Sequence, residues 1–194
     1  MIDPLSPKPM TLHEYDRLTP PPGEMYELYD GYIVAFSTGT GAHGLLCTRI
    51  STLLDTHTEP PCRAFGPSTI GVRRMGRATN VIPDGAVTCE ERDDSRTYIL
   101  APKLVVEVIS PGQSIKRDRV DKLDIYCAMP SVEEYLMVDS RKVWACIYRR
   151  VPGDAWIAVT RTSLDDKIDL LSINARLDLG HIYRGINLTG RRSA

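Results

Sequence analysis

Hydrophobic positions along the chain change their spacing several times, and these changes predict strands and helices in one chain. Apolar residues on both sides of Asp30-Gly31 predict a β-hairpin over residues 25–35, because Asp-Gly suits the tight turn of a hairpin. A helix is predicted from His43 onward, with one apolar stripe formed by Leu45, Leu46, Ile50, Leu53 and Leu54. Further strands are predicted over residues 62–74, 79–89, 134–139, 143–148 and 156–160.

A strand over residues 103–109, followed by a helix over about 113–128, is the centre of the predicted structure. The strand is apolar and rich in β-branched residues, which is typical of a strand buried on both faces of a sheet. Glu107 interrupts it, and a charge in such a place requires a partner, a metal ion or an opening to solvent. On the helix, Lys122 and Tyr126 are four residues apart and therefore share one face.

The order of these elements predicts one α/β domain of the α+β kind, with helices flanking a mixed central β-sheet. This domain is expected over residues 11–186, and it starts with a capping box in which Thr11 and Glu14 open a short helix through Leu18. Residues 1–10 are expected to form a flexible N-terminal arm and residues 187–194 a frayed tail.

Composition narrows the class of protein. The chain has 194 residues, of which 42% are hydrophobic and 25% charged, and a net charge of −1, so no overall basic field indicates nucleic acid. We find no membrane-spanning run and no signal-peptide pattern. The five cysteines are scattered without a CxxC pair, which favours reduced thiols, a cytoplasmic location and no structural zinc site.

Two carboxylates and one lysine are the candidates for chemistry. Pro83 is expected to bend the chain and expose Asp84 at the rim of the sheet. Asp84 and Glu107 would then lie on neighbouring strands, where they repel each other unless a divalent cation is shared between them. With Lys122 reaching over the same spot from its helix, this set suits metal-assisted phosphodiester hydrolysis.

Each residue also has an ordinary structural interpretation. A Pro-Asp pair such as Pro83-Asp84 is more often part of a turn than a metal site. Glu107 could pair with a neighbouring basic side chain, and a helical lysine such as Lys122 is usually solvated. The residues taken singly leave these alternatives open.

Taken together, the motifs resemble the Uma2 family (DUF820), which belongs to the PD-(D/E)XK restriction-endonuclease-like superfamily. The resemblance covers about residues 10–185 and rests on five segments in order. These are MYELYDG (25–31), His43 at the head of a helix, VIPDGAV (81–87), LVVEVISP (104–111) and D-x3-K-x3-Y (118–126) followed by VEEYLMVD (132–139). It implies a restriction-endonuclease-like core.

The resemblance also implies roles for individual residues. Asp84 and Glu107 would bind Mg²⁺ or Mn²⁺ with help from the carbonyl of Val108, and Glu27 would supply a further acid. The catalytic lysine of the superfamily normally follows the second acid by two residues, where this chain has Ile109. In Uma2-like sequences the lysine lies on the following helix, so Lys122 would position the attacking water.

Substrate contacts are expected at His43 and Tyr126, which would contact phosphate or orient a ligand, and at Lys116 and Arg117. Arg73, Arg74 and Arg77 form another basic cluster and are further candidate phosphate contacts, although such a cluster could equally be a solvated surface. The expected partner is nucleic acid, in the first place DNA, with no membrane association. We also expect a homodimer, paired through edge strands near residues 143–160.

The resulting hypothesis is a Mg²⁺- or Mn²⁺-dependent endonuclease. The near-neutral charge favours an alternative, a catalytically inactive module with the same fold that binds nucleic acid or protein. A metal-dependent hydrolase acting on another substrate is a third hypothesis, because a fold alone does not fix the substrate.

Overall fold

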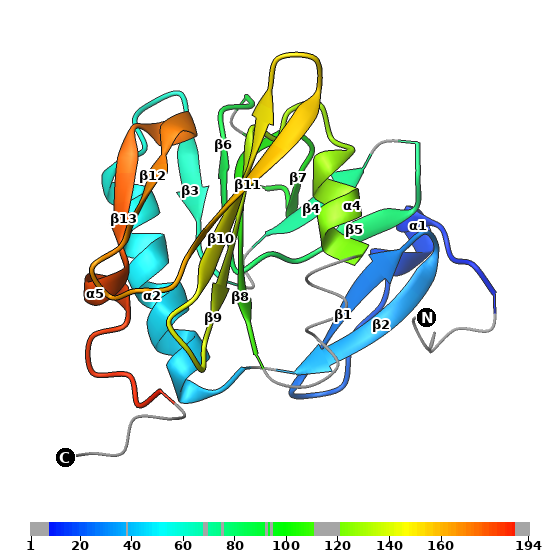
Figure 1. Ribbon diagram of the computed structural model, residues 1–194. Coiled ribbons are helices and arrows are strands. Elements are labelled where there is room, and N and C mark those ends of the chain that lie inside the picture. The colour runs from blue at the N-terminus through cyan, green and yellow to red at the C-terminus, as the bar shows by residue number, and fades with distance from the viewer. Residues whose placement is uncertain are drawn as a thin grey trace.

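Helices and β-sheets form layers in this protein, as the computed structural model shows (Figure 1). It describes residues 8–37, 39–67, 70–74, 76–91, 93, 95–110 and 121–188. The predicted fold class, a mixed α/β structure with helices flanking a mixed sheet, is confirmed. Most of the predicted arm (residues 1–7) and tail (residues 189–194) lies outside the described residues, while Met10 donates its N–H to the carbonyl of Gly31 at 2.6 Å.

The largest sheet has six strands in the order β11-β10-β9-β8-β6-β3. Their bounds are β3 (Arg63–Phe65), β6 (Gly85–Thr88), β8 (Pro102–Ile109), β9 (Glu134–Asp139), β10 (Ala145–Val151) and β11 (Ala155–Arg161). β8 and β9 are parallel and the other neighbours are antiparallel. Parallel neighbours need a crossover connection, and α4 (Lys122–Cys127) lies in it.

A second sheet has five strands in the order β2-β1-β5-β4-β7. Its strands are β1 (Glu24–Tyr29), β2 (Tyr32–Ser37), β4 (Gly71–Arg74), β5 (Thr79–Val81) and β7 (Tyr98–Ile99). The hairpin predicted around Asp30-Gly31 is confirmed, and both turn residues have positive φ, 47° and 91°. Each of the strands predicted over 62–74 and 79–89 is two strands, β3 and β4 in the first case and β5 and β6 in the second, and the two members of each pair belong to different sheets.

The remaining elements are short apart from α2 (Gly41–Thr56). α1 (Leu12–Tyr15) begins with the predicted capping box but ends before the predicted Leu18. β12 (Lys167–Leu170) and β13 (Ala175–Asp178) pair with each other, with η2 (Leu171–Ile173) between them and α5 (Leu179–Ile182) after them. The helix predicted over 113–128 is described from Lys122 onward, because residues 111–120 lie outside the described part of the chain.

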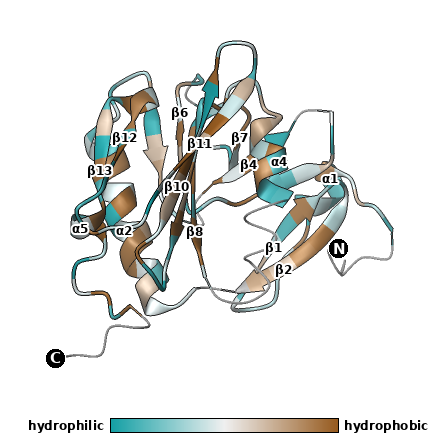
Figure 2. Ribbon diagram, viewed as in Figure 1, coloured by the Kyte–Doolittle hydropathy of each residue, from teal (hydrophilic) through white to brown (hydrophobic). Residues whose placement is uncertain are grey.

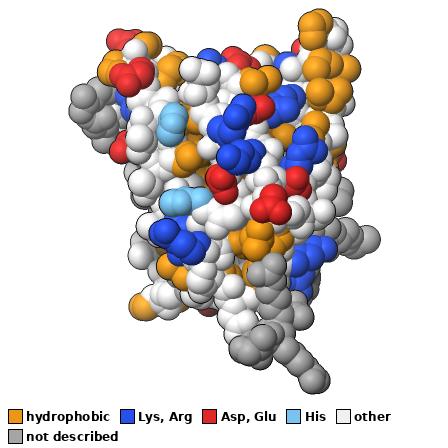
Figure 3. All heavy atoms as spheres, turned by 60° about the vertical axis from the view of Figure 1, so that its left-hand side comes forward, with side chains coloured by type: hydrophobic (Ala, Val, Ile, Leu, Met, Phe, Trp, Pro, Cys, Tyr) orange, Lys and Arg blue, Asp and Glu red, His pale blue; other side chains and the backbone are white. Residues whose placement is uncertain are grey.

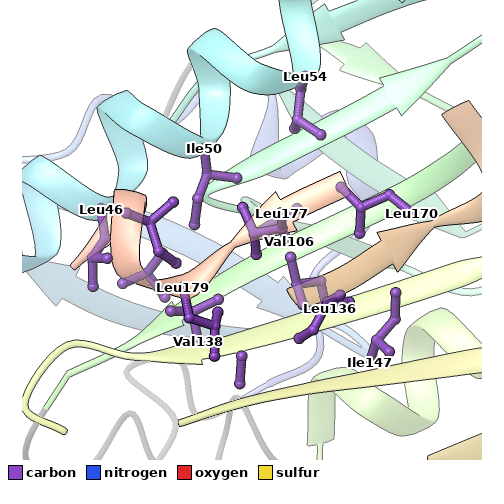
Figure 4. Packing of buried hydrophobic residues seen from close by; sticks show 14 of the residues in the cluster. Leu46, Ile50, Leu54, Val106, Leu136, Val138, Ile147, Leu170, Leu177 and Leu179 are labelled. Atoms are coloured by element: carbon purple, nitrogen blue, oxygen red, sulfur yellow. The ribbon is translucent and has the colours of Figure 1, made fainter. Parts of the chain in front are cut away.

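The first core lies between α2 and one face of the six-stranded sheet. Leu46, Ile50 and Leu54 are at most 1% exposed and point from α2 toward β8, β9 and β10 (Figure 4). Colouring by hydropathy shows the apolar residues of α2 and the central strands together (Figure 2). The prediction that Leu45 shares this stripe is wrong: it is 46% exposed, since consecutive helical residues point about 100° apart.

The other face of the six-stranded sheet forms the second core with α4 and the five-stranded sheet. Side chains alternate along β8: Val106 and Val108 lie in the first core, whereas Val105 and Ile109 lie in the second. The same alternation sends Glu107 toward α4 and β1.

Two cysteines correct the prediction that all five are reduced thiols. Cys62 and Cys89 form a disulfide, while Cys47, Cys127 and Cys146 are free. β3 pairs with β6 in an antiparallel register that joins Arg63 to Thr88. Cys62 and Cys89 flank that pair and therefore face each other, although they are 27 residues apart in the sequence.

Candidate active site

The site is built where the chain passes from one sheet to the other. β5 belongs to the five-stranded sheet and β6 to the six-stranded sheet, so residues 82–84 link the two. The predicted bend at Pro83 is therefore present. Asp84 lies at the start of β6, where its N–H donates to the carbonyl of Val106 at 3.1 Å. One carboxylate oxygen of Asp84 accepts the N–H of Val108 at 2.7 Å, which holds the side chain against β8.

Glu107 is buried, with 3% of its surface exposed, and its charge is balanced by Lys122. The ammonium nitrogen of Lys122 lies 2.8 Å from Glu107 Oε1, and the hydroxyl of Tyr126 donates to the same oxygen at 2.9 Å. Both partners come from one face of α4, as their spacing predicted. The partner that a mid-strand acid requires is thus the lysine singled out from the sequence.

Glu27 completes this buried network from β1. Its Oε1 lies 2.9 Å from the ammonium nitrogen of Lys122 and accepts the N–H of Ile82 at 2.8 Å. Its Oε2 accepts the hydroxyl of Tyr29 at 2.8 Å. Lys122 also donates to the carbonyl of Ile82 at 3.3 Å. An ammonium group has three N–H donors, and three acceptors from three parts of the chain surround it here.

The network fixes the protonation state of its members. Burial lowers the pKa of Lys122, but the neighbouring charges of Glu107 and Glu27 outweigh burial and raise that pKa well above its ordinary value. Burial, followed by the charge of Glu107, also raises the pKa of Tyr126 well above its ordinary value. Lys122 is therefore a cation at neutral pH and can donate hydrogen bonds but not accept a proton.

Asp84 faces a different set of side chains, on α2. His43 Nε2 lies 3.3 Å from the carboxylate oxygens of Asp84, and the side chains of this pair are 16% and 18% exposed. Cys47, one turn further along α2, places its sulfur 3.5 Å from His43 Nδ1 and 3.8 Å from His43 Nε2. Burial raises the pKa of the Cys47 thiol, and the charges of Asp84 and Glu107 add to the effect. Both carboxylates thus lie within electrostatic reach of one sulfur atom.

The local sequence explains how His43 is held. Thr40 caps α2 by accepting the N–H of His43 at 3.4 Å. A Cβ on Gly39 would lie only 2.5 Å from the Cγ of His43, so this position admits no larger residue unless the imidazole moves. The turn of small residues before α2 therefore seats the ring against Asp84.

The structure thus gathers Glu27, Asp84, Glu107 and Lys122 around the link between the sheets, with His43 beside Asp84. Val108 contacts Asp84 through its N–H, and a metal bond from its carbonyl stays a prediction. The catalytic and metal-binding roles of the gathered residues also stay predictions.

Two of the expected substrate contacts need correction. Tyr126 is 0% exposed and hydrogen-bonded to Glu107. Its burial contradicts the expected contact with phosphate, whereas the alternative role, orienting a ligand such as Glu107, stays a prediction. Arg73 is buried as well: it pairs with Asp16, donates to Asn80 at 2.9 Å and stacks on the ring of Tyr98. Their burial removes both residues from a phosphate-binding surface.

Lys116 and Arg117 lie outside the described residues, so their predicted contact with substrate stays a prediction. On the face shown in Figure 3, Lys and Arg side chains lie among Asp and Glu side chains. This mixture agrees with the net charge of −1.

Sequence reasoning missed two residues of the site. Tyr29 lies two residues after Glu27 on the same strand, and this spacing puts both on one face. Cys47 follows His43 by four residues, which puts both on one face of α2. Each signal was present in the spacing, but neither residue type alone indicated the contact.

Comparison with known proteins agrees with the fold and its motifs. The chain resembles the crystal structure of a "putative nuclease belonging to DUF820" from Anabaena variabilis, with a TM-score of 0.69, 17% identity, and coverage of 90% of this chain and 98% of that one. At this identity the likeness shows the fold alone, a mixed α/β structure with helices flanking mixed β-sheets.

The family follows from the sequence comparison. Residues 12–180 match the model of Uma2, described as "Putative restriction endonuclease". An uncharacterized protein of Synechocystis sp. is 32% identical over 164 residues, which are 84% of this chain and 85% of that protein. The chain therefore belongs to the Uma2 family, as its motifs predicted. In the described part of the chain, no helix has the length and apolar character needed to cross a membrane.

Proposed function

We propose that this protein is a divalent-metal-dependent endonuclease that hydrolyses phosphodiester bonds of nucleic acid, DNA in the first place. The proposal rests on one observation above all. Asp84, Glu107 and Lys122 lie far apart in the sequence, yet the carboxylate of Asp84 is bonded to the backbone of Val108, next to the buried Glu107–Lys122 pair. Membership of a family described as a restriction endonuclease supports the same reaction.

The donor set suits Mg²⁺ or Mn²⁺, since both ions prefer carboxylate and carbonyl oxygens. Asp84 is held at the start of β6 with its side chain 18% exposed, so an ion has access to it from solvent. The carboxylate of Asp84 accepts the N–H of Val108, the residue directly after Glu107, so the two acids lie next to each other on neighbouring strands. These two residues would hold the ion, which would supply charge stabilisation for the phosphate and a more acidic bound water.

The other side chains would orient and stabilise. Lys122 keeps its positive charge because two carboxylates raise its pKa, so it would donate a hydrogen bond to the attacking water or to a phosphate oxygen. Tyr126 and Glu27 hold Glu107 and Lys122 in place through the contacts described above. His43, in contact with Asp84 and partly exposed, would contact the phosphate or orient the carboxylate.

A second function is favoured by the closed state of the lysine. Glu27, Glu107 and the carbonyl of Ile82 surround its three donors, so the ammonium group would have to give up one acceptor to reach a substrate. This favours the alternative of an inactive module that binds nucleic acid or protein.

The test uses purified protein with supercoiled plasmid, linear DNA and single-stranded RNA, each in the presence of Mg²⁺ or Mn²⁺. We expect cleavage that falls by a factor of about 100 or more in Asp84→Asn and Glu107→Gln, because removing a single charge-stabilising group commonly has this effect. Glu133→Gln is the matched control, since Glu133 is exposed and pairs only loosely with Lys103 at 3.7 Å; it should cut like the wild type.

Calorimetric titration of Mn²⁺ separates the two functions. An active site should bind Mn²⁺ in the wild type and lose this binding in Glu107→Ala. If no substrate is cut and Mn²⁺ binds neither alone nor with an oligonucleotide, the nuclease proposal is wrong. Retention of oligonucleotide binding by Glu107→Ala in that case would support the inactive module.

A further inference from the structure

A group of metal-ligating side chains lies on the α2 side of the site, and two of its three members, His43 and Cys47, are not ligands of the ion in the proposed magnesium chemistry. It consists of His43, Cys47 and Asp84, whose ligand atoms all lie within 4.8 Å of one another. Within the described residues, no other group of three or more His, Cys, Asp or Glu side chains meets this condition.

The distances between the ligand atoms suit one tetrahedral ion. With Zn–S of about 2.3 Å, Zn–N of about 2.05 Å and Zn–O of about 2.0 Å, tetrahedral angles give S···N of about 3.6 Å and N···O of about 3.3 Å. The structure has 3.8 Å between Cys47 Sγ and His43 Nε2, and 3.3 Å between His43 Nε2 and the Asp84 carboxylate. The third distance, from Cys47 Sγ to the Asp84 carboxylate, is within 4.8 Å. Because the sulfur is almost equidistant from Nδ1 and Nε2, it lies beside the imidazole, and the ring would turn so that Nε2 and the sulfur contact one ion.

The surroundings also suit an ion of this kind. Cys47 is 2% exposed and lies next to the apolar stripe of α2, so its sulfur is the buried ligand atom of the group and is shielded from solvent. His43 and Asp84 form the rim, and their side chains are 16% and 18% exposed, which gives an ion a path from solvent. His43 and Cys47 are four residues apart on one helix, and the N–H of Val108 holds the carboxylate of Asp84, so the imidazole of His43 is the part of the group that would turn on binding.

We propose that His43 Nε2, Cys47 Sγ and the carboxylate of Asp84 form a site for a thiophilic divalent ion, Zn²⁺ or a close analogue. Three protein ligands leave the fourth position of a tetrahedral ion open for water or a phosphate oxygen. Sulfur selects zinc-like ions against Mg²⁺, which prefers oxygen. On binding, the thiol proton of Cys47 leaves to solvent and the thiolate forms the bond to the ion.

Binding of a zinc-like ion would affect the proposed nuclease activity, because Asp84 is a ligand in both the zinc-like site and the proposed Mg²⁺ or Mn²⁺ site. A zinc-like ion would occupy a carboxylate that Mg²⁺ or Mn²⁺ needs, so it would inhibit Mg²⁺-dependent cleavage. This consequence rests on the proposed function, whereas the binding site itself does not.

The test uses Co²⁺ as a spectroscopic probe with the full-length, disulfide-intact protein under anaerobic, reductant-free conditions. We expect one equivalent of Co²⁺ to give a near-ultraviolet thiolate-to-cobalt charge-transfer band, which Zn²⁺ abolishes and Mg²⁺ does not. Cys47→Ser should lose the band. His43→Gln should weaken Co²⁺ binding on the order of 100-fold or more, since even outer-shell changes weaken metal binding 10- to 100-fold.

Two matched variants make the result specific. Cys146 is also a buried, free cysteine, 3% exposed, and lies outside the group, so Cys146→Ser should keep the band. Glu107→Gln should also keep the charge-transfer band while losing any nuclease activity. Loss of the band and loss of cleavage therefore test the zinc-like site and the nuclease proposal separately. Absence of the band from saturated wild type, or its persistence in Cys47→Ser, would overturn the zinc-like site. His43→Gln, at a partly exposed position, keeps the test valid if Cys47→Ser does not fold.

Discussion

The two carboxylates of the site lie on neighbouring strands but in opposite surroundings. Glu107 is sealed in the second core, and its charge is balanced by Lys122 and oriented by Tyr126. Asp84 lies at the link between the sheets, partly exposed, with His43 as its side-chain neighbour. The difference separates two duties within one site: Glu107 also stabilises the buried framework, whereas Asp84 lies where an ion enters from solvent, and both would hold the proposed ion.

Removal of the buried cation should have the largest effect on stability. Lys122→Met would leave Glu107 and Glu27 buried without their common partner, which should cost about 3–5 kcal/mol of unfolding free energy. Urea titration gives this value. Lys103→Met is the control, since the Lys103–Glu133 pair is exposed and should contribute less than about 1 kcal/mol. Equal losses of unfolding free energy in Lys122→Met and Lys103→Met would contradict the conclusion that Glu107 and Glu27 depend on a buried cation.

Neutralising each carboxylate in turn should give a smaller but asymmetric result. Glu107→Gln weakens a charge-assisted contact and should cost roughly 1.5–3 kcal/mol. Asp84→Asn keeps an acceptor for the Val108 N–H at a partly exposed position and should change stability by less than about 1 kcal/mol. Both values come from urea titration. If Asp84→Asn destabilised as much as Glu107→Gln, the division of duties would be wrong.

The smallest expected effect is a change in alkaline pH dependence. Burial raises the pKa of Tyr126 above its ordinary value of 10.0, so the folded state keeps a proton that the unfolded chain loses. Its contribution to stability is present below about pH 10 and declines as pH rises toward the raised pKa. Tyr126→Phe should therefore make the fall in stability above about pH 10 shallower, by at most about 1.4 kcal/mol per pH unit.

This slope is measured by urea titration between about pH 9 and pH 11. Tyr32→Phe serves as the control, because Tyr32 is 38% exposed and its side chain is in contact with solvent in the folded state. Identical slopes for Tyr126→Phe and the wild type would contradict the buried, neutral tyrosine.

Much of the Glu107 side could be predicted from the sequence. A carboxylate inside an apolar strand demands a partner, and the spacing of Lys122 and Tyr126 predicted that both lie on one helix face, which the structure places over Glu107. The hydrogen bond from Tyr126 to Glu107 itself was not predicted. The hairpin that carries Glu27 had an equally local signal in Asp30-Gly31. These features depend on the periodic spacing of residues along a helix or strand and on the residue types of a turn, both of which can be read from a single sequence.

The parts that escaped prediction depend on pairing between distant segments. The Cys62–Cys89 disulfide follows from the register of β3 on β6, which no local pattern reveals. Arg73 looked like a surface cation, but its burial follows from β4 lying inside the five-stranded sheet, where Asp16 meets it. Cys47 looked like a small apolar residue until α2 brought it under His43 and beside Asp84.

The three acceptors around Lys122 also have a kinetic consequence. Ile82 and Glu107 precede it by 40 and 15 residues, and Glu27 lies further away still, so the contacts join distant segments of the chain. If these contacts form after the transition state of folding, their loss accelerates unfolding and leaves the folding rate unchanged. The lifetime of the folded chain would then be set in part by the same ammonium group that the proposed reaction needs.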